Sequence, residues 1–142
     1  MTDLLDVNVW LALADADHKH HAVARDYWLK LDAPLLAFCR ISMLGFLRLS
    51  TQPKVLSFTP SMREAWNLYR QYLSDPRVVF INEPQDFETS MENLTYAPGF
   101  VHRLWTDAYL AALAIASGSR LVSLDSDFQT FKDLNFFQLT PS

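Results

Sequence analysis

Short apolar runs alternate with longer segments in which apolar residues recur at helical spacing. The runs are rich in leucine, valine and phenylalanine and predict five short strands over residues 3–7, 35–38, 78–81, 121–124 and 136–139. The segments between them predict helices over residues 9–14, 18–31, 40–50, 61–73, 84–93 and 106–117. Strands that alternate with helices indicate an α/β domain with a mostly parallel sheet. We expect a single domain spanning residues 1–142.

Local signals set the expected ends of these elements. Asp17 is a suitable N-cap for the second helix, which should end near Leu31, before Pro34. Gly118 follows the last helix at the position where glycine commonly closes one. Within the fourth helix, Trp66, Tyr69 and Tyr72 share one side and predict core or interface contacts.

Composition limits the class of protein. Half of the residues are apolar and 13% are aromatic, which is ample for a core. The net charge of −4 does not favour tight, non-specific nucleic-acid binding, although a local basic patch stays compatible with it. Cys39 is the one cysteine, which excludes an internal disulfide and a cysteine-based zinc site and fits a reducing compartment. The acidic start is unlike a secretory signal, and the longest apolar stretch, Ala108–Ala116, is too short for a membrane span, so we expect a soluble cytoplasmic protein.

Three aspartates lie where strands and helices meet. Asp6 and Asp125 each end an apolar run, and Asp107 opens the apolar helix that continues to Ala116. The carboxyl ends of parallel strands are where α/β sheets collect ligands. Burying a carboxylate is costly without a positive partner, and no lysine or arginine stands beside Asp6 in sequence. We therefore expect the three to share a divalent cation, Mg²⁺ or Mn²⁺, whose preferred ligands are oxygens.

Such an ion suits phosphodiester hydrolysis. It lowers the pKa of bound water and neutralises the oxygens of the attacked phosphate. Each aspartate also has an ordinary interpretation: Asp6 as a helix N-cap, Asp107 as an early-turn acid favoured by the helix dipole, and Asp125 as a turn residue. Their joint placement favours the metal site.

Other kinds of site have weaker support. His18 and His21 are three residues apart and lack the further ligands that zinc needs, so a solvated helix start is favoured. The chain has no glycine-rich phosphate loop and no Ser-His-Asp arrangement. A receiver-like signalling domain would need an adjacent acidic pair near the first strand and a lysine after a late strand. Asp3 and Asp6 are not adjacent, and Lys132 lies in a different context.

Three segments closely resemble motifs of PIN-domain ribonucleases, in the same order and with similar spacing. They are residues 4–10 (LLDVNVW), 106–114 (TDAYLAALA) and 121–128 (LVSLDSDF). The length and spacing resemble the VapC toxins of type II toxin–antitoxin pairs. The resemblance implies an α/β/α fold and a Mg²⁺- or Mn²⁺-dependent endoribonuclease. Its acidic cluster would be Asp6, Asp107 and Asp125, with Asp127 further out and Asn8, Thr106 and Ser123 orienting carboxylates or water.

The resemblance also implies partners. VapC-like proteins are usually dimers inhibited by a small VapB-like antitoxin. Arg103 and His102 precede Asp107, and Arg48 and Arg40 lie in the third helix, so these basic residues are candidates for contacts to RNA phosphates. Arg48 and Arg103 are also the residues that we expect to meet an inserted antitoxin side chain.

The chain departs from the PIN pattern at one position. PIN domains usually carry a glutamate on the helix after the second strand, and here residues 41–48 read ISMLGFLR, which places Gly45 there. The gap predicts one metal ion rather than two. It also supports an alternative, a catalytically impaired PIN-like module that binds RNA or a protein. On helix propensity alone, Gly45→Glu should be tolerated.

Overall fold

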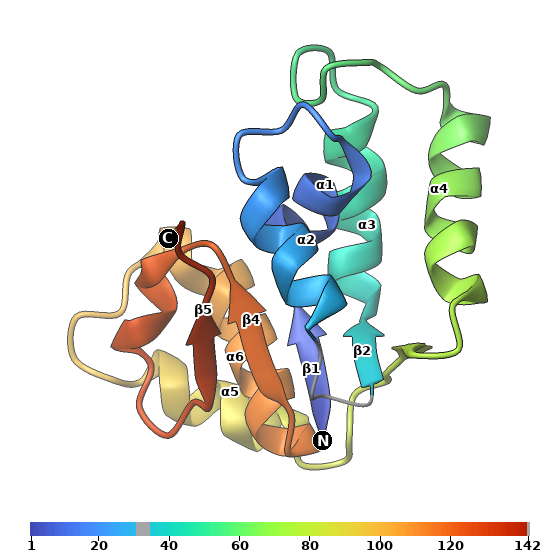
Figure 1. Ribbon diagram of the computed structural model, residues 1–142. Helices are drawn as coiled ribbons and strands as arrows, with labels where there is room; N and C mark the ends of the chain where they lie inside the picture. The colour runs from blue at the N-terminus through green and yellow to red at the C-terminus, as the bar shows by residue number, and fades with distance from the viewer. Residues whose placement is uncertain (31–34, 142) are drawn as a thin grey trace.

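A computed structural model describes residues 1–30 and 35–141 and contains one five-stranded sheet (Figure 1). Every neighbouring pair of strands is parallel, in the order β3-β2-β1-β4-β5. The strands are β1 (Thr2–Leu5), β2 (Leu35–Phe38), β3 (Val78–Phe80), β4 (Arg120–Ser123) and β5 (Phe136–Gln138). All five predicted strands are present, and the predicted α/β/α class is confirmed.

Helices cover both faces of the sheet. They are α1 (Val7–Ala14), α2 (His21–Leu29), α3 (Arg40–Ser50), α4 (Met62–Ser74), α5 (Phe87–Thr95) and α6 (Trp105–Ser117), with 3-10 turns η1 (His102–Leu104) and η2 (Ser126–Thr130). Successive strand residues serve opposite faces, because side chains alternate along a strand. Leu5 packs with α1 to α4 in one core, and Leu4 packs with α5 and α6 in the other.

β1 and α1 are joined without a loop. The strand was predicted to continue to Val7, but it ends at Leu5, and α1 begins at Val7. The cause is Asp6, whose extended backbone and carboxylate form an N-cap, with the Val7 amide donating to Asp6 Oδ1 at 2.7 Å. This connection fixes Asp6 at the carboxyl end of the strand.

The start of α2 differs from the prediction. The helix begins at His21 rather than His18, and Asp17 does not cap it. Instead the Asp17 amide donates to Asp15 Oδ1 at 3.0 Å, and Asp15 also accepts two hydrogen bonds from Ser57. Asp15 is buried, so its three hydrogen bonds favour turns here over helix. The predicted helix end near Leu31 and the break at Pro34 lie outside the described residues.

The aromatic side of α4 belongs mainly to the core. Tyr69 is buried, and Tyr72 donates a hydrogen bond to the Trp10 carbonyl at 2.8 Å. Trp10 in turn stacks on Phe38 of β2, with ring centroids 3.9 Å apart. Of the three aromatics predicted to mark a core or an interface, Trp66 is the exposed one.

The middle of α6 is deeply buried. Residues Leu110 to Ala114 are almost completely inaccessible, and Gly118 ends the helix with φ +68°, as predicted. Despite this apolar character, no helix in the described residues is long and apolar enough to cross a membrane.

A buried carboxylate near the amino end of β1 has a protein cation as its partner. Arg120 of β4 binds Asp3 through two hydrogen bonds, of 3.0 and 2.8 Å, and Tyr27 of α2 donates a third at 2.6 Å. Asp3 is inaccessible to solvent. The buried charge of Asp3 is therefore compensated by side chains of the protein itself.

Breaking this pair should destabilise the protein strongly. Arg120→Met leaves the Asp3 carboxylate buried and uncompensated, and the free energy of unfolding should fall by about 3 kcal/mol in urea denaturation. Arg25→Met, at an exposed position of α2, is the control and should change stability by less than about 0.5 kcal/mol. Equal effects of the two substitutions would contradict a structural role for the pair.

Candidate metal centre

Four aspartates meet at the carboxyl edge of the sheet. Asp6 follows β1, Asp125 follows β4, and Asp127 lies two residues later in η2. Asp107 comes from the first turn of α6. The crossover order of the sheet makes β1 and β4 neighbours, so segments more than a hundred residues apart converge here.

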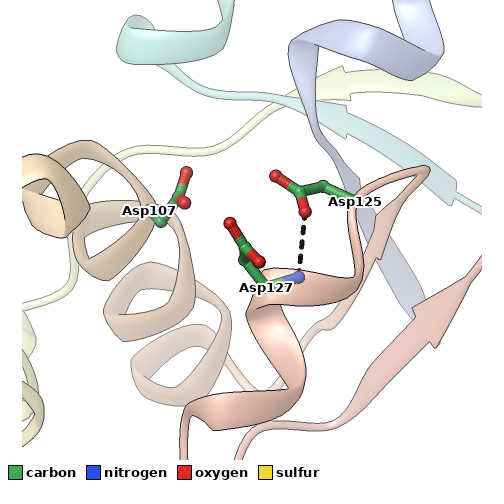
Figure 2. Close-up of side chains that lie close together, drawn as sticks. All are labelled: Asp107, Asp125 and Asp127. Carbon is green, nitrogen blue, oxygen red and sulfur yellow. Dashed lines mark hydrogen bonds between the residues drawn. The ribbon is translucent and has the colours of Figure 1, made fainter. Parts of the chain in front are cut away.

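Three of the four form a compact group. Asp107, Asp125 and Asp127 each offer a carboxylate oxygen within 4.8 Å of the others, and Figure 2 shows the three side chains pointing toward one another. The Asp127 amide donates to Asp125 Oδ1 at 2.9 Å, which holds the Asp125-Ser126-Asp127 turn. Asp127, expected in an outer position, is thus part of the group. The Asp-x-Asp spacing directly after a strand is the sequence signal for this.

Asp6 lies beside the group rather than within it. Its Oδ1 accepts from the Val7 amide, and its Oδ2 accepts from the Ser123 hydroxyl at 2.8 Å. The pKa of Asp6 is raised by burial, and the negative charge of Asp125 adds to the rise. Asp6 is therefore close enough to the group to feel the negative charge of Asp125. Its participation in a metal site stays a prediction.

Asn8 and Ser123 connect the acidic segments. Ser123 is buried, and its hydroxyl also accepts from the Asp125 amide at 3.0 Å and from Asn8 Nδ2 at 3.1 Å. Asn8 Oδ1 accepts from the Leu124 amide at 3.2 Å. Both residues therefore join the segments that carry Asp6 and Asp125, and their role in orienting a metal ligand stays a prediction. Thr106 is exposed, and no hydrogen bond among the described residues joins it to a carboxylate.

The acids repel one another in the absence of a cation. The pKa of Asp107 is raised to about 6, first by burial and then by the charges of Asp6, Asp125 and Asp127. Arg103 opposes this rise only weakly, since it is exposed and its guanidinium lies 3.7 Å from Asp127. An all-oxygen donor set with surplus negative charge fits a hard divalent cation.

The basic residues predicted to contact RNA lie at different distances from the acidic group. Arg103 is at the cluster through its contact with Asp127, and His102 stands exposed beside it in η1. Arg48 is exposed in the last turn of α3, and within the described residues it makes no ion pair with the acids. The Nδ1 atom of His18 accepts a hydrogen bond from the His20 amide. The Nδ1 atom of His21 forms a hydrogen bond with the Ala12 carbonyl.

Gly45 lies against the residue that follows Asp6. A Cβ at this position would be 2.6 Å from Val7 Cγ2. Valine is stiff about χ1 and cannot easily move aside. The expectation that Gly45→Glu would be tolerated is therefore wrong, because helix propensity ignores the close approach of α3 to α1. The close approach of Val7 leaves no room for a side chain at position 45.

Known proteins identify the family. The family model described as PIN domain matches residues 4–134. Ribonuclease VapC41 of Mycobacterium tuberculosis is 37% identical over 134 residues, covering 90% of this chain and 92% of that protein. Ribonuclease VapC38 of the same species is 37% identical over 128 residues, covering 87% and 84%. The chain belongs to the PIN-domain family, and these relatives place it among the VapC ribonucleases.

Solved structures agree in fold. VapBC2 of Rickettsia felis, bound to a DNA fragment from its promoter, aligns over 99% of this chain and 100% of the matched chain with a TM-score of 0.73 and 16% identity. VapC20 of M. tuberculosis, a sarcin-ricin loop cleaving toxin, aligns over 93% and 98% with a TM-score of 0.68 and 18% identity. At these identities the likeness concerns the fold.

Removing the Asp107 charge should stabilise the metal-free protein at neutral pH. With its pKa raised to about 6, this carboxyl contributes stability that is complete below the unfolded value of 3.8 and is lost as pH rises through 6. In EDTA, the free energy of unfolding of Asp107→Asn relative to wild type should therefore increase between pH 4 and pH 7. Asp86→Asn, which removes an exposed carboxylate at the start of α5, is the control and should not reproduce the trend. A trend of opposite sign would refute the repulsion.

Filling the space at Gly45 should destabilise the protein despite better helix propensity. Alanine gains up to about 1 kcal/mol of propensity, but overpacking against Val7 costs roughly 1–3 kcal/mol. We expect a net loss for Gly45→Ala in chemical denaturation. In Val7→Ala/Gly45→Ala the loss should be smaller than the sum of the single losses, because the clash is absent. Leu44→Ala, at an exposed neighbouring position, is the control; simple additivity would show that the two residues do not touch.

Proposed function

We propose that the protein is a metal-dependent endoribonuclease that hydrolyses RNA phosphodiester bonds, and that it is the toxin of a VapBC-like pair. The observation that carries this proposal is the carboxylate group at the sheet edge, where Asp107, Asp125 and Asp127 converge and where, among the described residues, only the exposed Arg103 forms an ion pair, at 3.7 Å from Asp127. The ribonuclease names of its relatives give the substrate class. The cation is Mg²⁺ or Mn²⁺, since oxygen ligands suit both.

The acidic residues at the sheet edge are suited to hold the ion. Asp107, Asp125 and Asp127 would bind it together, and Asp6 would supply negative charge from beside them. When bound, the ion makes water a stronger nucleophile and offsets charge on the phosphate. The Ser123 hydroxyl donates to Asp6 and accepts from the Asp125 amide, so it would help to orient both carboxylates toward a bound ion.

Basic side chains at the rim are proposed to contact the RNA. Arg103 is best placed, because it lies beside Asp127 and is largely exposed. His102 precedes it, and Arg48 would act on a more distant phosphate or on an inserted antitoxin side chain.

The proposed partners are a VapB-like antitoxin and a second copy of the chain. Two of the structural neighbours are VapBC assemblies, from R. felis and from nontypeable Haemophilus influenzae. An exposed Trp66 with Arg70 stacked over it, 5.4 Å from the ring centroid, is a suitable contact for a partner. We place the protein in the cytoplasm, where its RNA substrate would be.

A catalytically impaired module is the second candidate, because Gly45 replaces the usual glutamate. A full set of four aspartates at the edge favours activity with a single ion. The two candidates differ in one measurable property, metal-dependent cleavage.

Purified protein should cleave RNA with Mg²⁺ or Mn²⁺ and lose this activity in EDTA. Asp107→Asn and Asp125→Asn should abolish cleavage while keeping the fold. Ser123→Ala should weaken metal binding or activity by about 10- to 100-fold, the usual effect of losing a group that orients a ligand. Glu92→Gln, on the exposed side of α5, is the control. Full activity in either asparagine variant, or in EDTA, would exclude the proposed mechanism, and no cleavage by wild type would favour the impaired module.

A further inference from the structure

A hollow lies at the carboxyl ends of β2 and β3, along the same edge of the sheet as the acidic group. It has a volume of about 270 Å³ and is lined by Arg40, Phe80, Ile81, Asn82, Glu83 and Tyr109. Pockets for drug-sized ligands usually measure about 300–1,000 Å³. This hollow is smaller, and its size suits a single planar ring system.

The hollow lies close to the acidic centre along the edge of the sheet. Asp6 directly follows β1, and Arg40 begins α3 two residues after the end of β2; these two parallel strands are neighbours in the sheet, about 5 Å apart. Tyr109 belongs to the same helix as Asp107, α6. A polynucleotide whose phosphate lies at the acids can therefore place a neighbouring nucleotide in the hollow.

The walls are held in place before any ligand arrives. The Arg40 guanidinium lies 4.5 Å from the centroid of the Phe80 ring, and its Nη1 is 3.1 Å from Met43 Sδ. Tyr109 donates to Glu83 Oε2 at 2.7 Å, and its ring rests on Phe87 with centroids 4.9 Å apart. A guanidinium plane and an aromatic ring are both surfaces on which an unstacked RNA base can stack.

The charges in the hollow distinguish a base from a phosphate. Arg40 and Glu83 both line it, and within the described residues neither forms an ion pair. A carboxylate repels a phosphate but accepts hydrogen bonds from a base edge. Guanine has two adjacent donors, N1–H and the N2 amino group, that match a carboxylate, and its O6 and N7 acceptors match a guanidinium. Adenine, cytosine and uracil each lack either the two adjacent donors that match Glu83 or the two adjacent acceptors that match Arg40.

We propose that this hollow binds a guanine base of the RNA, next to the nucleotide that is cleaved, with Glu83 and Arg40 reading its edge. The proposal rests on the ribonuclease function for its biological meaning. Glu83 is then a specificity residue, and Tyr109 is a positioning residue that acts through Glu83.

Binding without cleavage gives the first test. Guanosine 5′-monophosphate should bind the metal-free wild-type protein more tightly than the adenosine, cytidine and uridine monophosphates. In NMR titrations the amide signals of residues 80–83 should shift. Glu83→Gln, which keeps the shape but replaces an acceptor oxygen with a donor, should reduce the guanine preference roughly 10- to 100-fold. Tyr109→Phe should reduce it less, since the ring remains.

Glu88→Gln is the matched control, since it removes an exposed carboxylate from α5, away from the hollow, and it should leave the preference unchanged. Cleavage of randomised oligoribonucleotides gives the second test: wild type should prefer guanine at one position beside the cut, and Glu83→Gln should lose that preference.

Equal binding of the four nucleotides, or an unchanged preference in Glu83→Gln, would overturn the proposal even if the enzyme cleaves RNA. Guanine-specific binding by a protein that cleaves no RNA would instead overturn the ribonuclease function and leave the base site standing.

Discussion

The arrangement of the molecule depends on uncompensated negative charge at one edge of a parallel sheet. β1 shows the contrast within a single strand. Asp3, near its amino end, is buried, but Arg120 and Tyr27 supply three hydrogen bonds and a positive charge. Asp6, directly after its carboxyl end, accepts hydrogen bonds from the neutral Val7 amide and Ser123 hydroxyl, and it lies close enough to Asp125 and Asp107 for their charges to interact. Among the described residues Asp3 forms an ion pair and Asp6 does not, and this contrast supports the proposal of an external cation at this edge.

The rigidity of this edge comes from the elements behind it. α1 begins immediately after Asp6, and α6 presents Asp107 from a helix whose next turns are almost fully buried. Ser123 and Asn8 join the segments after β1 and β4 by side-chain hydrogen bonds. These supports hold Asp6 and Asp107 close to the other acids. The pKa of Asp107 is raised first by burial, and the charges of the neighbouring carboxylates add to the rise.

The sequence predicted the elements well and their junctions less well. Apolar runs and helical spacing identified the five strands and six α-helices of the described residues, because both depend on local side-chain patterns, but not the short 3-10 turns η1 and η2. The strand end at Leu5 and the late start of α2 depended on Asp6 and Asp15, whose hydrogen bonds compete with continued strand or helix. Asp6 and Asp125 could be proposed from strand ends and Asp107 from a helix start, whereas Asp127, Asn8 and Ser123 came from the family motifs. The clash at Gly45, the Asp3–Arg120 pair and the hollow around Glu83 could not, since each joins residues far apart in sequence.

The two hydrogen bonds of Asp6 have an evolutionary consequence. This side chain starts α1 through Val7 and anchors β4 through Ser123, so it supports the architecture as well as the charge of the site. Asp127, by contrast, is exposed. In a lineage under selection to inactivate the protein, neutral substitutions at Asp107 or Asp127 would therefore be favoured, because they would remove a charge from the site and leave the fold intact. Decayed copies should keep Asp6 long after the other acids have drifted, and its presence alone is a poor sign that such a copy is still active.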